Sequence, residues 1–484
     1  MSSEVHHLHP AAMLIGAIKT VRRWISAAAI PGVAALAGGG WQMTTLILIG
    51  VFVIVAGSAL WGFLSWRATT YEVSGGAFHL RQGVIQKNER TIPLEHVQSV
   101  DTVQGIIQRL FGVVEVRVET AGGGASEPDA TLSALGRGAA EALRREIEGP
   151  RREDFAEEES GPVVLRRLGT RELLIAGATS GQIGVALSLI AVVSQLFDDV
   201  LSEGFVQRLY ESLAPRSVTA VVALILIVGL LAWLLAIGGT ILAYAGFTLS
   251  RDGDFLYIKR GLLERREATI PLARIQAVRI VEGVLRQPFG LAALRVESAG
   301  YGEDAGVSTT LFPLVPRKEA QKLLIDATPE FAVAPTLGRL PARALRRYIL
   351  RATIPALLLA AAIALTYFLT LDSLLGGLFA LVLIPPAAAH GWLRYRAAGW
   401  AFEDDRLITR IRRLARSTAI APRRRLQSRD VIRSPFQRRA RLATFRARVA
   451  SGGRGAALQV ADLDSDTADA LAASLGPRPY RTER

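Results

Sequence analysis

Six long apolar runs, arranged in three pairs, dominate the hydropathy pattern of the chain. They cover residues 24–36 and 44–61, 173–193 and 218–247, and 350–370 and 374–389. A bilayer core of about 30 Å takes roughly 20 helical residues, so four of the runs are long enough to cross it alone. The first and last runs are shorter, but they have Trp24 and Trp392 near their ends, as at a membrane interface. The pattern predicts six transmembrane helices in three hairpins.

A soluble bundle of buried helices is the alternative interpretation of these runs. No charged side chain interrupts the central stretch of any run. A helix that is apolar all round has no polar face to present to water. The mean hydropathy of +0.30 and the 50% of hydrophobic residues are also high for a soluble protein. We therefore favour the membrane interpretation.

The segments that follow the hairpins alternate polar and apolar residues with the period of two that is typical of strands. In the middle segment, residues 255–260 alternate up to Gly261, which suits a hairpin turn. Residues 263–270 return to Pro271, which cannot donate to a strand ladder. The amphipathic stretch 316–327 begins with proline, as helices often do. The pattern predicts a small β-barrel or sandwich with a C-terminal helix after each hairpin, and hence a multi-domain α+β membrane protein.

The three segments are copies of one unit. The first two copies align without a gap at an offset of 178 residues (271 − 93 = 178), and the third follows at 151 (422 − 271 = 151). In the third copy, Ala440 and Arg441 replace the Phe-Gly turn of the others, so we expect it to superpose less well on them near Ala440. A function tied to the replaced residues need not be shared by this copy. The recurring residues, to which we assign a structural role, are Pro93, Gln98, Gly105, Gly112, Pro271, Gln276, Gly283, Gly290, Pro422 and Gln427. Repeats at a fixed register are each one folded unit.

Domain boundaries follow from the runs and the repeats. An interfacial N-terminus with the first hairpin (1–67) precedes the first repeat (68–148), and a charged linker follows (149–170). The second hairpin (171–246) and second repeat (247–327) precede a linker that contains prolines (328–345). The third hairpin (346–397), the divergent Arg-rich third repeat (398–475) and a basic tail (476–484) complete the chain.

The charge distribution orients the chain. The net charge is +14, and the Lys and Arg residues gather in the segments outside the hairpins. The predicted hairpin connections have an excess of acids instead. One holds Asp198, Asp199, Glu203 and Glu211 against Arg208 and Arg216, and another holds only Asp372. Because an excess of Lys and Arg marks the cytoplasmic side, we expect both termini and all three repeats in the cytoplasm.

Few catalytic chemistries are open to this sequence. The chain has no cysteine, which excludes disulfides, cysteine-ligated metals and a thiol nucleophile. It contains no Walker-type phosphate loop, no GxSxG elbow and no HExxH motif. His79 and His96 of the first repeat are replaced by Tyr257 and Arg274 in the second, so a shared metal or catalytic histidine is disfavoured. We expect a protein that is not an enzyme and has no cofactor and no metal.

The repeats resemble the bacterial pleckstrin-homology-like (PH-like) domains of membrane proteins of the YdbS/YdbT type. The residues that carry the resemblance are Ile270-Pro271-Leu272, Gln276, the Phe289-Gly290 turn and the strand end at 295–300, with their counterparts in the first copy. The resemblance covers nearly the whole chain. It implies PH-like barrels attached to membrane helices, with no established reaction and no agreed ligand.

The third repeat is exceptionally rich in arginine. Residues 406–454 contain sixteen arginines and one carboxylate, Asp430. The candidate contacts to anionic lipid are Arg412, Arg413, Arg416, Arg423, Arg424 and Arg425. Next to an anionic membrane surface each would contribute at most about 1 kcal/mol. A solvated face that only enforces orientation is the alternative. Nucleic acid is disfavoured as a partner because no aromatic residues interleave with the arginines.

These observations predict a non-enzymatic, multi-pass protein of the cell membrane. It would present three cytoplasmic domains as a scaffold for partner proteins or as a reader of anionic lipid. The partner would be a membrane or cytoplasmic protein, with a smaller protein of the same family as one candidate. The alternative is a transporter or lipid-handling protein whose helix hairpins form a path, which a polar seam on facing helices would favour.

Overall fold

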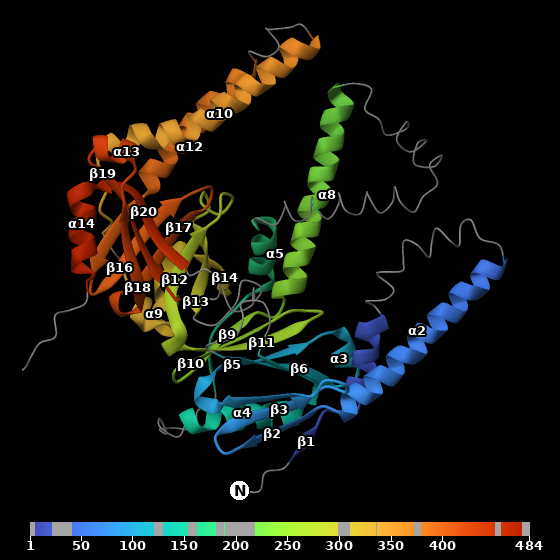
Figure 1. The fold of residues 1–484 in the computed structure, drawn as a ribbon. Helices are drawn as coiled ribbons and strands as arrows, with labels where there is room; N and C mark the ends of the chain where they lie inside the picture. Colours follow the sequence, from blue (N-terminus) through green and yellow to red (C-terminus); the bar gives the residue numbers. More distant parts are fainter. Residues whose placement is uncertain are drawn as a thin grey trace, which may run out of the picture. The chain divides into compact units, whose positions relative to one another are not determined.

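A computed structural model describes residues 5–21, 41–120, 129–152, 162–180, 188, 218–298, 310–334, 336–371, 379–450 and 456–476 (Figure 1). These residues belong to two compact units, Met1–Ala273 and Arg274–Arg484, and each unit is considered by itself. The boundary between the units lies inside the second repeat, just after the third of its strands.

The first unit contains two antiparallel sheets. The smaller has the order β1-β2-β3-β4, with strands β1 (His6–His7), β2 (Thr70–Ser74), β3 (Ala77–Gln82) and β4 (Asn88–Pro93). The larger has the order β7-β6-β5-β11-β10-β9-β8 and consists of β5 (Val97–Gln104), β6 (Val113–Thr120), β7 (Ala130–Gly136), β8 (Val163–Arg167), β9 (Thr248–Asp252), β10 (Phe255–Arg260) and β11 (Arg265–Pro271).

One hydrophobic core joins the strands of the first repeat. Its helices are Ala11–Val21, α2 (Trp41–Arg67), α3 (Ile106–Leu110), α4 (Arg137–Arg152) and the short 3-10 turn η1 (Leu94–His96). Phe78 of β3, Val116 of β6 and Leu132 of β7 are fully buried in this core, and Leu143 of α4 and Ile15 of the first helix pack into it. Burying each such side chain contributes about 1.5–3 kcal/mol. The first repeat is therefore two packed sheets with a C-terminal helix, as the alternating pattern predicts.

The second unit repeats this plan. Its six-stranded sheet has the order β14-β13-β12-β17-β16-β15, with β12 (Ile275–Glu282), β13 (Leu291–Ser298), β14 (Thr310–Pro316), β15 (Gly399–Glu403), β16 (Arg406–Arg412) and β17 (Arg416–Pro422). Its three-stranded sheet has the order β18-β19-β20, with β18 (Leu426–Ile432), β19 (Leu442–Val449) and β20 (Ala456–Asp464). The helices are α9 (Arg317–Ala327), α10 (Ala342–Leu371), α12 (Ile384–Ala397), α13 (Pro435–Arg439) and α14 (Ser465–Ser474), with the 3-10 turns η4 (Pro329–Phe331), η5 (Phe379–Leu383) and η6 (Arg423–Arg425).

The copies have the same strand pairing residue for residue. Ala77 pairs with Pro93 in the first repeat, and their counterparts Phe255 and Pro271 pair in the second. The third repeat keeps this order in β15–β17, where Arg406 pairs with Pro422. The predicted correspondence of strand order is thus confirmed, and it extends to the divergent third copy.

Neighbouring repeats share their sheets, which the sequence did not predict. β5 of the first repeat pairs with β11 of the second, placing Gln104 opposite Arg265. β12 of the second repeat pairs with β17 of the third, placing Glu282 opposite Arg416. These two pairs occupy the same repeat position, so both junctions between repeats have one register. The expectation of a separate barrel after each hairpin is therefore incomplete, because each junction is a continuous sheet.

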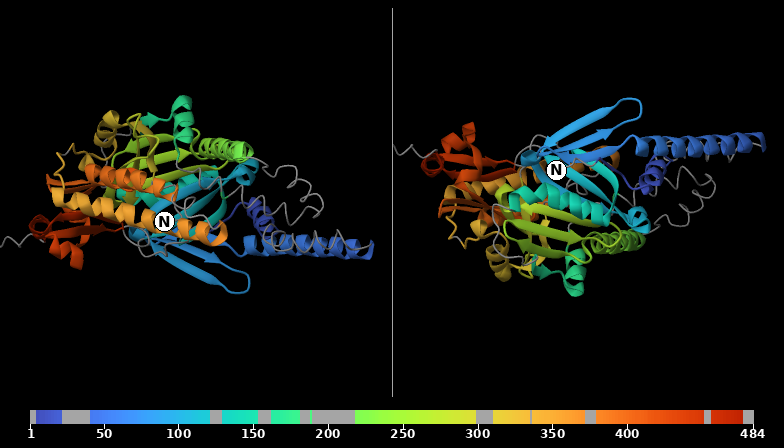
Figure 2. Two further views of the ribbon diagram at one scale, coloured as in Figure 1. Left: turned by 90° about the horizontal axis from the view of Figure 1, so that it is seen from above. Right: turned by 90° about the horizontal axis from the view of Figure 1, so that it is seen from below.

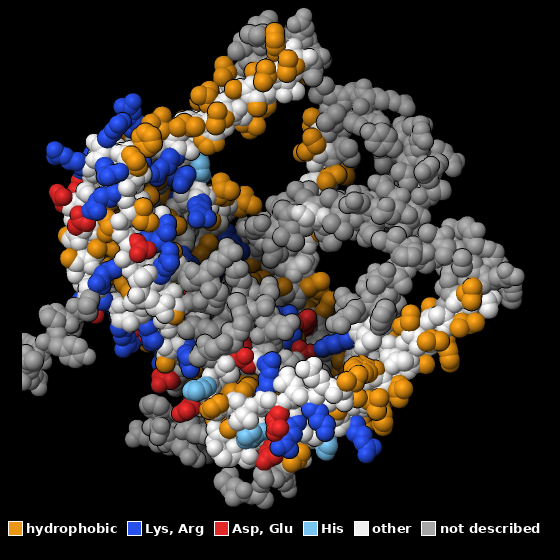
Figure 3. All heavy atoms as spheres, in the orientation of Figure 1, with side chains coloured by type: hydrophobic (Ala, Val, Ile, Leu, Met, Phe, Trp, Pro, Cys, Tyr) orange, Lys and Arg blue, Asp and Glu red, His pale blue; other side chains and the backbone are white. Residues whose placement is uncertain are grey.

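Three described helices are long and apolar enough to cross a membrane: Ile49–Arg67, Ile225–Tyr244 and Ala342–Leu369. α2 projects beyond the sheets of its unit in all views (Figures 1 and 2), and hydrophobic side chains line its exposed length (Figure 3). The predicted run 24–36 and most of the run 173–193 lie outside the described residues. The run 374–389 is described in part, as η5 and the start of α12. The structure therefore supports three membrane helices, and six spans are a proposal taken up below.

Glycines allow the described helices to approach one another closely. Gly62 of α2 faces the carbonyl oxygen of Met13, Gly177 of α5 (Thr170–Ala178) faces Ile237 of α8 (Val218–Tyr244), and Gly391 of α12 faces Tyr348 of α10. A Cβ atom added at Gly62 or Gly391 would lie within 2.7 Å of a carbonyl oxygen. Small residues at such contacts are typical of packed membrane helices.

A short extended segment precedes each pair of apolar runs and pairs with the first strand that follows it. His6 pairs with Tyr71, Val164 with Ser250, and Gly338 forms an isolated bridge with Trp400. The segments that the sequence analysis treated as linkers, 149–170 and 328–345, therefore contain β8 and this bridge. Both ends of each pair of runs are thereby held at the same edge of a sheet.

Candidate membrane-facing site

The helix that precedes each repeat delivers the chain to the same end of a β-hairpin. α8 ends at Tyr244, and Thr248 then pairs with Lys259 at the end of β10. The turn after β10 is bonded directly to the last turn of α8, because the Leu262 amide donates to the Leu242 carbonyl oxygen at 3.0 Å. The equivalent turns of the three repeats, residues 83–87, 261–264 and 413–415, thus lie beside the helix ends. We name them the membrane-proximal tips.

Each membrane-proximal tip exposes a large apolar side chain at the same repeat position. Ile85 is 86% exposed, Leu263 46% and Leu414 67%. Single exposed apolar residues are common on soluble proteins. Here, however, three of them occupy one repeat position, and each lies beside the end of a helix that leads into a repeat. Apolar side chains placed in this way could insert into the membrane interface.

Exposed apolar residues also occur in a second set of turns, at differing positions of the repeat. The turns that follow β5, β12 and β18 expose Leu110, Phe289 and Phe436. Arg109 of the first of these turns donates to the Leu262 carbonyl oxygen, and its counterpart Gln287 donates to the Leu414 carbonyl oxygen, both at 3.3 Å. Each junction between repeats therefore presents an apolar turn and an apolar tip together.

A basic pocket of about 280 Å³ lies at the end of α8, beneath the tip of the second repeat. The Arg260 guanidinium lies 4.8 Å from the centre of the Tyr244 ring, which fixes it at the helix end. Among the described residues, Arg265 has no carboxylate partner. The charged residues that line the pocket are Lys259, Arg260, Arg265, Arg266 and Glu267. Lys259 pairs with Glu267 at 3.2 Å and Arg266 pairs with Glu264 at 2.5 Å. The remaining excess of positive charge favours an anionic ligand such as a phosphate group.

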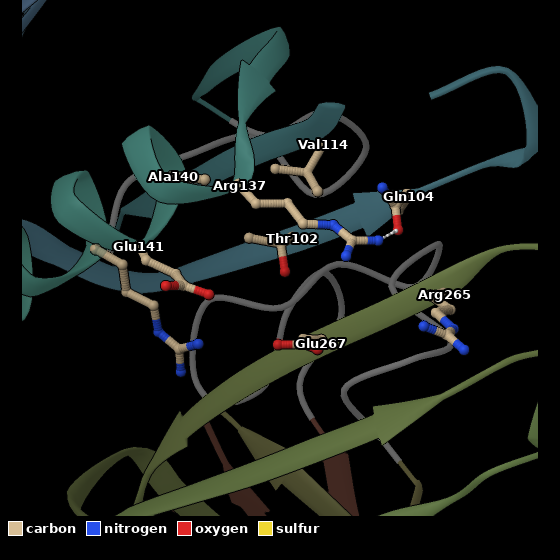
Figure 4. Close-up of a pocket in the computed structure, with 9 residues that line it drawn as sticks. Thr102, Gln104, Val114, Arg137, Ala140, Glu141, Arg265 and Glu267 are labelled. Atoms are coloured by element: carbon tan, nitrogen blue, oxygen red, sulfur yellow. Dashed lines mark hydrogen bonds between the residues drawn. The ribbon is translucent and has the colours of Figure 1, made fainter. Parts of the chain in front are cut away.

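Arg265 also lines a cavity of about 190 Å³ between α4 and β11 (Figure 4). There Arg137 Nη2 donates to Gln104 Oε1 at 2.8 Å. At the other junction the counterpart of Gln104 is Glu282. Its buried carboxylate accepts hydrogen bonds from Nε and Nη2 of Arg416. The change from glutamate to glutamine thus leaves Arg265 without the carboxylate that its counterpart Arg416 holds.

The six arginines singled out in the sequence form two groups at opposite ends of β17. Arg412, Arg413 and Arg416 lie at or next to the tip of the third repeat, whereas η6 (Arg423–Arg425) follows the far end of the strand. Seven strand residues separate the groups by roughly 23 Å. The structure therefore does not gather the six into one patch, although Lys and Arg side chains are numerous over the visible face of this unit (Figure 3).

Most of these arginines have partners within the unit. Arg423 pairs with Asp405 at 3.7 Å, and Arg424 and Arg425 pair with Glu330 at 2.8 and 3.8 Å. Arg416 pairs with Glu282. Among the described residues, Arg412 and Arg413 contact no carboxylate. They remain the members of the set that can meet an anionic membrane surface.

Most of the recurring residues of the repeats lie at chain reversals and strand ends. Pro93, Pro271 and Pro422 each end a strand before a 3-10 turn. Gly112 and Gly290 have φ values of 66° and 60°, and Arg441 keeps this left-handed conformation with φ 53°. Gly105 precedes α3, and Gly283 occupies the equivalent position before the turn of the second repeat. Gln276 donates to the Arg274 carbonyl oxygen at 3.1 Å, and Gln427 is exposed in β18. The side chain of Gln98 lies outside the described residues.

Three buried carboxylates were missed by the sequence analysis: Glu115, Glu282 and Asp462. The available signal was a lone acid in an apolar strand, as in Val113-Val114-Glu115-Val116. Burial alone would raise the pKa of Glu115, but the Lys19 ammonium and the Arg117 guanidinium outweigh it and lower that pKa below its usual value. Lys19 thereby ties the first helix to the sheet. No group of three or more His, Asp or Glu residues suited to a metal occurs in the described part of the chain.

Comparisons with known proteins agree with this repeat architecture. A family model described as bacterial PH domain matches residues 14–151, 211–326 and 349–478. The chain is 32% identical over 489 residues to the UPF0699 transmembrane protein YdbT of Bacillus subtilis (strain 168), with 97% of each chain covered. No solved structure matches the chain.

Proposed function

Because the chain belongs to the bacterial PH domain family, we propose that it is a non-enzymatic membrane protein whose PH-like repeats bind anionic lipid headgroups through their membrane-proximal tips. The recurrence of an exposed apolar residue at Ile85, Leu263 and Leu414 is the observation that carries the proposal. Insertion of these side chains into the headgroup region would remove apolar surface from water.

The basic residues beside the tips supply the preference for anionic lipid. Arg265 in the pocket at the end of α8 and Arg412 and Arg413 in the third repeat lie within a few residues of Leu263 and Leu414. Each such side chain contributes about 1 kcal/mol next to an anionic surface, which corresponds to about fivefold in affinity. Bound in this way, the repeats would form a scaffold on the membrane that can present surfaces to partner proteins.

A probe at position 414 tests the insertion. In nanodiscs, a fluorophore on Leu414→Cys should be quenched by lipids that carry a nitroxide near the headgroup, because the tip enters the interface. The chain has no native cysteine, so labelling is specific. The matched control is Asp404→Cys in the hairpin between β15 and β16, at the opposite end of the same strands, which should stay unquenched. Equal quenching at 404 and 414 would remove the basis of the proposal.

The same probe tests whether insertion of the tip depends on the charge of the lipid headgroups. Quenching at 414 should be stronger in nanodiscs with phosphatidylglycerol than in neutral ones, and Arg412→Gln with Arg413→Gln should reduce that difference. Two basic side chains amount to at most about 2 kcal/mol at low salt, and the effect should weaken as salt is added. If the double variant kept the same difference in quenching between the two kinds of nanodisc, the preference for anionic lipid would belong to other residues.

The proposal extends to six spans in three hairpins with both termini and all repeats in the cytoplasm. The acidic predicted connections and the Arg-rich flanks support this topology. Single cysteines at Ser202 and Ser373, which lie outside the described residues, should react with an impermeant thiol reagent added to intact cells. A cysteine at Ser465, at the start of α14, should react only after the cells are opened. Labelling of position 465 in intact cells would reverse the orientation.

A further inference from the structure

In the described part of the chain, one strand of the first repeat and one strand of the third lack the neighbouring strand that their counterparts have. β11 and β17 each pair with a strand of the preceding repeat, whereas their counterpart β4 is the last strand of its sheet among the described residues. β5 and β12 each pair with a strand of the following repeat, whereas their counterpart β18 is the last strand of its sheet in the described part of the chain. β4 of the first repeat and β18 of the third thus correspond to the two strands that pair at each junction between repeats.

Burial along these strands agrees with two open edges. Thr91 of β4 is exposed, but its counterparts Thr269 and Ile420 are buried at the two junctions. Ser428 of β18 is exposed, but its counterpart Ala277 is fully buried in β12. A strand edge with unpaired amide and carbonyl groups is a template for pairing with another chain.

The register of the existing junctions defines how the open edges would pair. At the second junction Arg279 lies opposite Ala419 and Ile280 lies opposite Thr418. The repeat offsets transfer these pairs to Asp430 opposite Arg90 and to Val431 opposite Glu89. They also place Arg433, which pairs with Asp469, opposite Lys87 just beyond the ends of the two strands. Opposite charges directly across two antiparallel strands stabilise the pairing. Asp430 is the one carboxylate among the sixteen arginines of residues 406–454. It lies opposite Arg446 of β19 within its own repeat, and the proposed register sets Arg90 on its other side.

We propose that copies of this chain associate head to tail, by antiparallel pairing of β18 of one copy with β4 of the next. The new interface continues the sheet that already joins the repeats inside one chain. It is heterologous, because it uses two different surfaces, so it generates a ring or an open row of copies in the membrane. This inference rests on sheet topology and charge, and it is independent of lipid binding.

Disulfide cross-linking between full-length copies tests the register. Glu89→Cys and Val431→Cys, carried on separate copies and mixed in native membranes, should form a dimer on oxidation, because residues directly opposite have Cβ atoms about 4.5–5.5 Å apart. The double variant should form a ladder of larger species. The matched control is Ile432→Cys with Glu89→Cys, since a shift of one residue turns the side chain to the other face of the sheet.

Charge reversal tests the same interface in a second way. Arg90→Asp should reduce the cross-link between positions 89 and 431 at least fivefold, and adding Asp430→Arg should restore it. Equal cross-linking at 431 and 432, or no cross-link at 431 while the protein stays folded, would overturn the proposal. A cross-link from position 89 to a different polypeptide instead of to position 431 would also overturn it, by assigning the β4 edge to another partner.

Discussion

Replacing Asp462 with asparagine should unfold the third repeat at a markedly lower temperature. Asp462 is fully buried, and its carboxylate accepts from Arg347 Nε at 3.0 Å and from Gln437 Nε2 at 2.8 Å and pairs with Arg351 Nη1 at 2.8 Å. Removing the charge leaves two arginines of α10 without their counter-ion, which costs about 3–5 kcal/mol. Since Asp462 has φ 58°, asparagine is the suitable replacement because it tolerates that conformation.

The melting temperature of the detergent-solubilised protein, followed by fluorescence-detected size-exclusion chromatography, measures this loss. A cost of about 3 kcal/mol corresponds to roughly 6–12 °C for a unit of this size. Asp464→Asn is the matched control, because Asp464 pairs with Arg343 of the same helix but is 32% exposed. An exposed pair contributes at most about 1 kcal/mol, and asparagine preserves the N-cap of α14. Equal shifts for the two variants would show that the buried carboxylate does not anchor α10.

Local sequence patterns were sufficient to predict the elements within each repeat. Alternation over residues 255–260 and the proline at 271 defined β10 and the end of β11, because side-chain period and a missing amide donor act locally. The glycines at 112 and 290 marked turns that need a left-handed residue, and both have positive φ. The apolar runs predicted the three described membrane helices because length and composition alone decide that question.

The partners of those elements could not be predicted in the same way. β4 and β11 share their sequence pattern, yet among the strands that the structure describes β11 has a neighbour from another repeat and β4 has none. Strand pairing depends on which edges meet in space, and a local pattern carries no such information. The same reason explains the arginines of the third repeat. Arg416 was assigned to lipid by composition, but it reaches a carboxylate 134 residues away in the sequence.

Replacing Glu282 with glutamine should weaken the junction between the second and third repeats. The Glu282 carboxylate is 1% exposed, is clamped by Arg416 and lies 3.7 Å from Arg317. Burial and the neighbouring guanidinium groups of Arg317 and Arg416 lower the pKa of Arg410, whereas the Glu282 carboxylate opposes this shift. The amide would leave these cations uncompensated, and we expect a loss of about 3 kcal/mol, measured as a fall in melting temperature of roughly 6–12 °C.

A double-mutant cycle separates the charge from the shape of the side chain. Arg416→Gln alone should also destabilise the protein, because it leaves the buried Glu282 carboxylate without the guanidinium that clamps it. Combining the two changes replaces a buried ion pair by two neutral amides, and the first junction, where Gln104 faces Arg265, shows that an amide fits at this position. The double variant should therefore be more stable than the sum of the single losses implies, with a coupling of about 1–3 kcal/mol. Strictly additive losses would show that Glu282 and Arg416 act independently, and the clamp would then not be what holds β12 to β17.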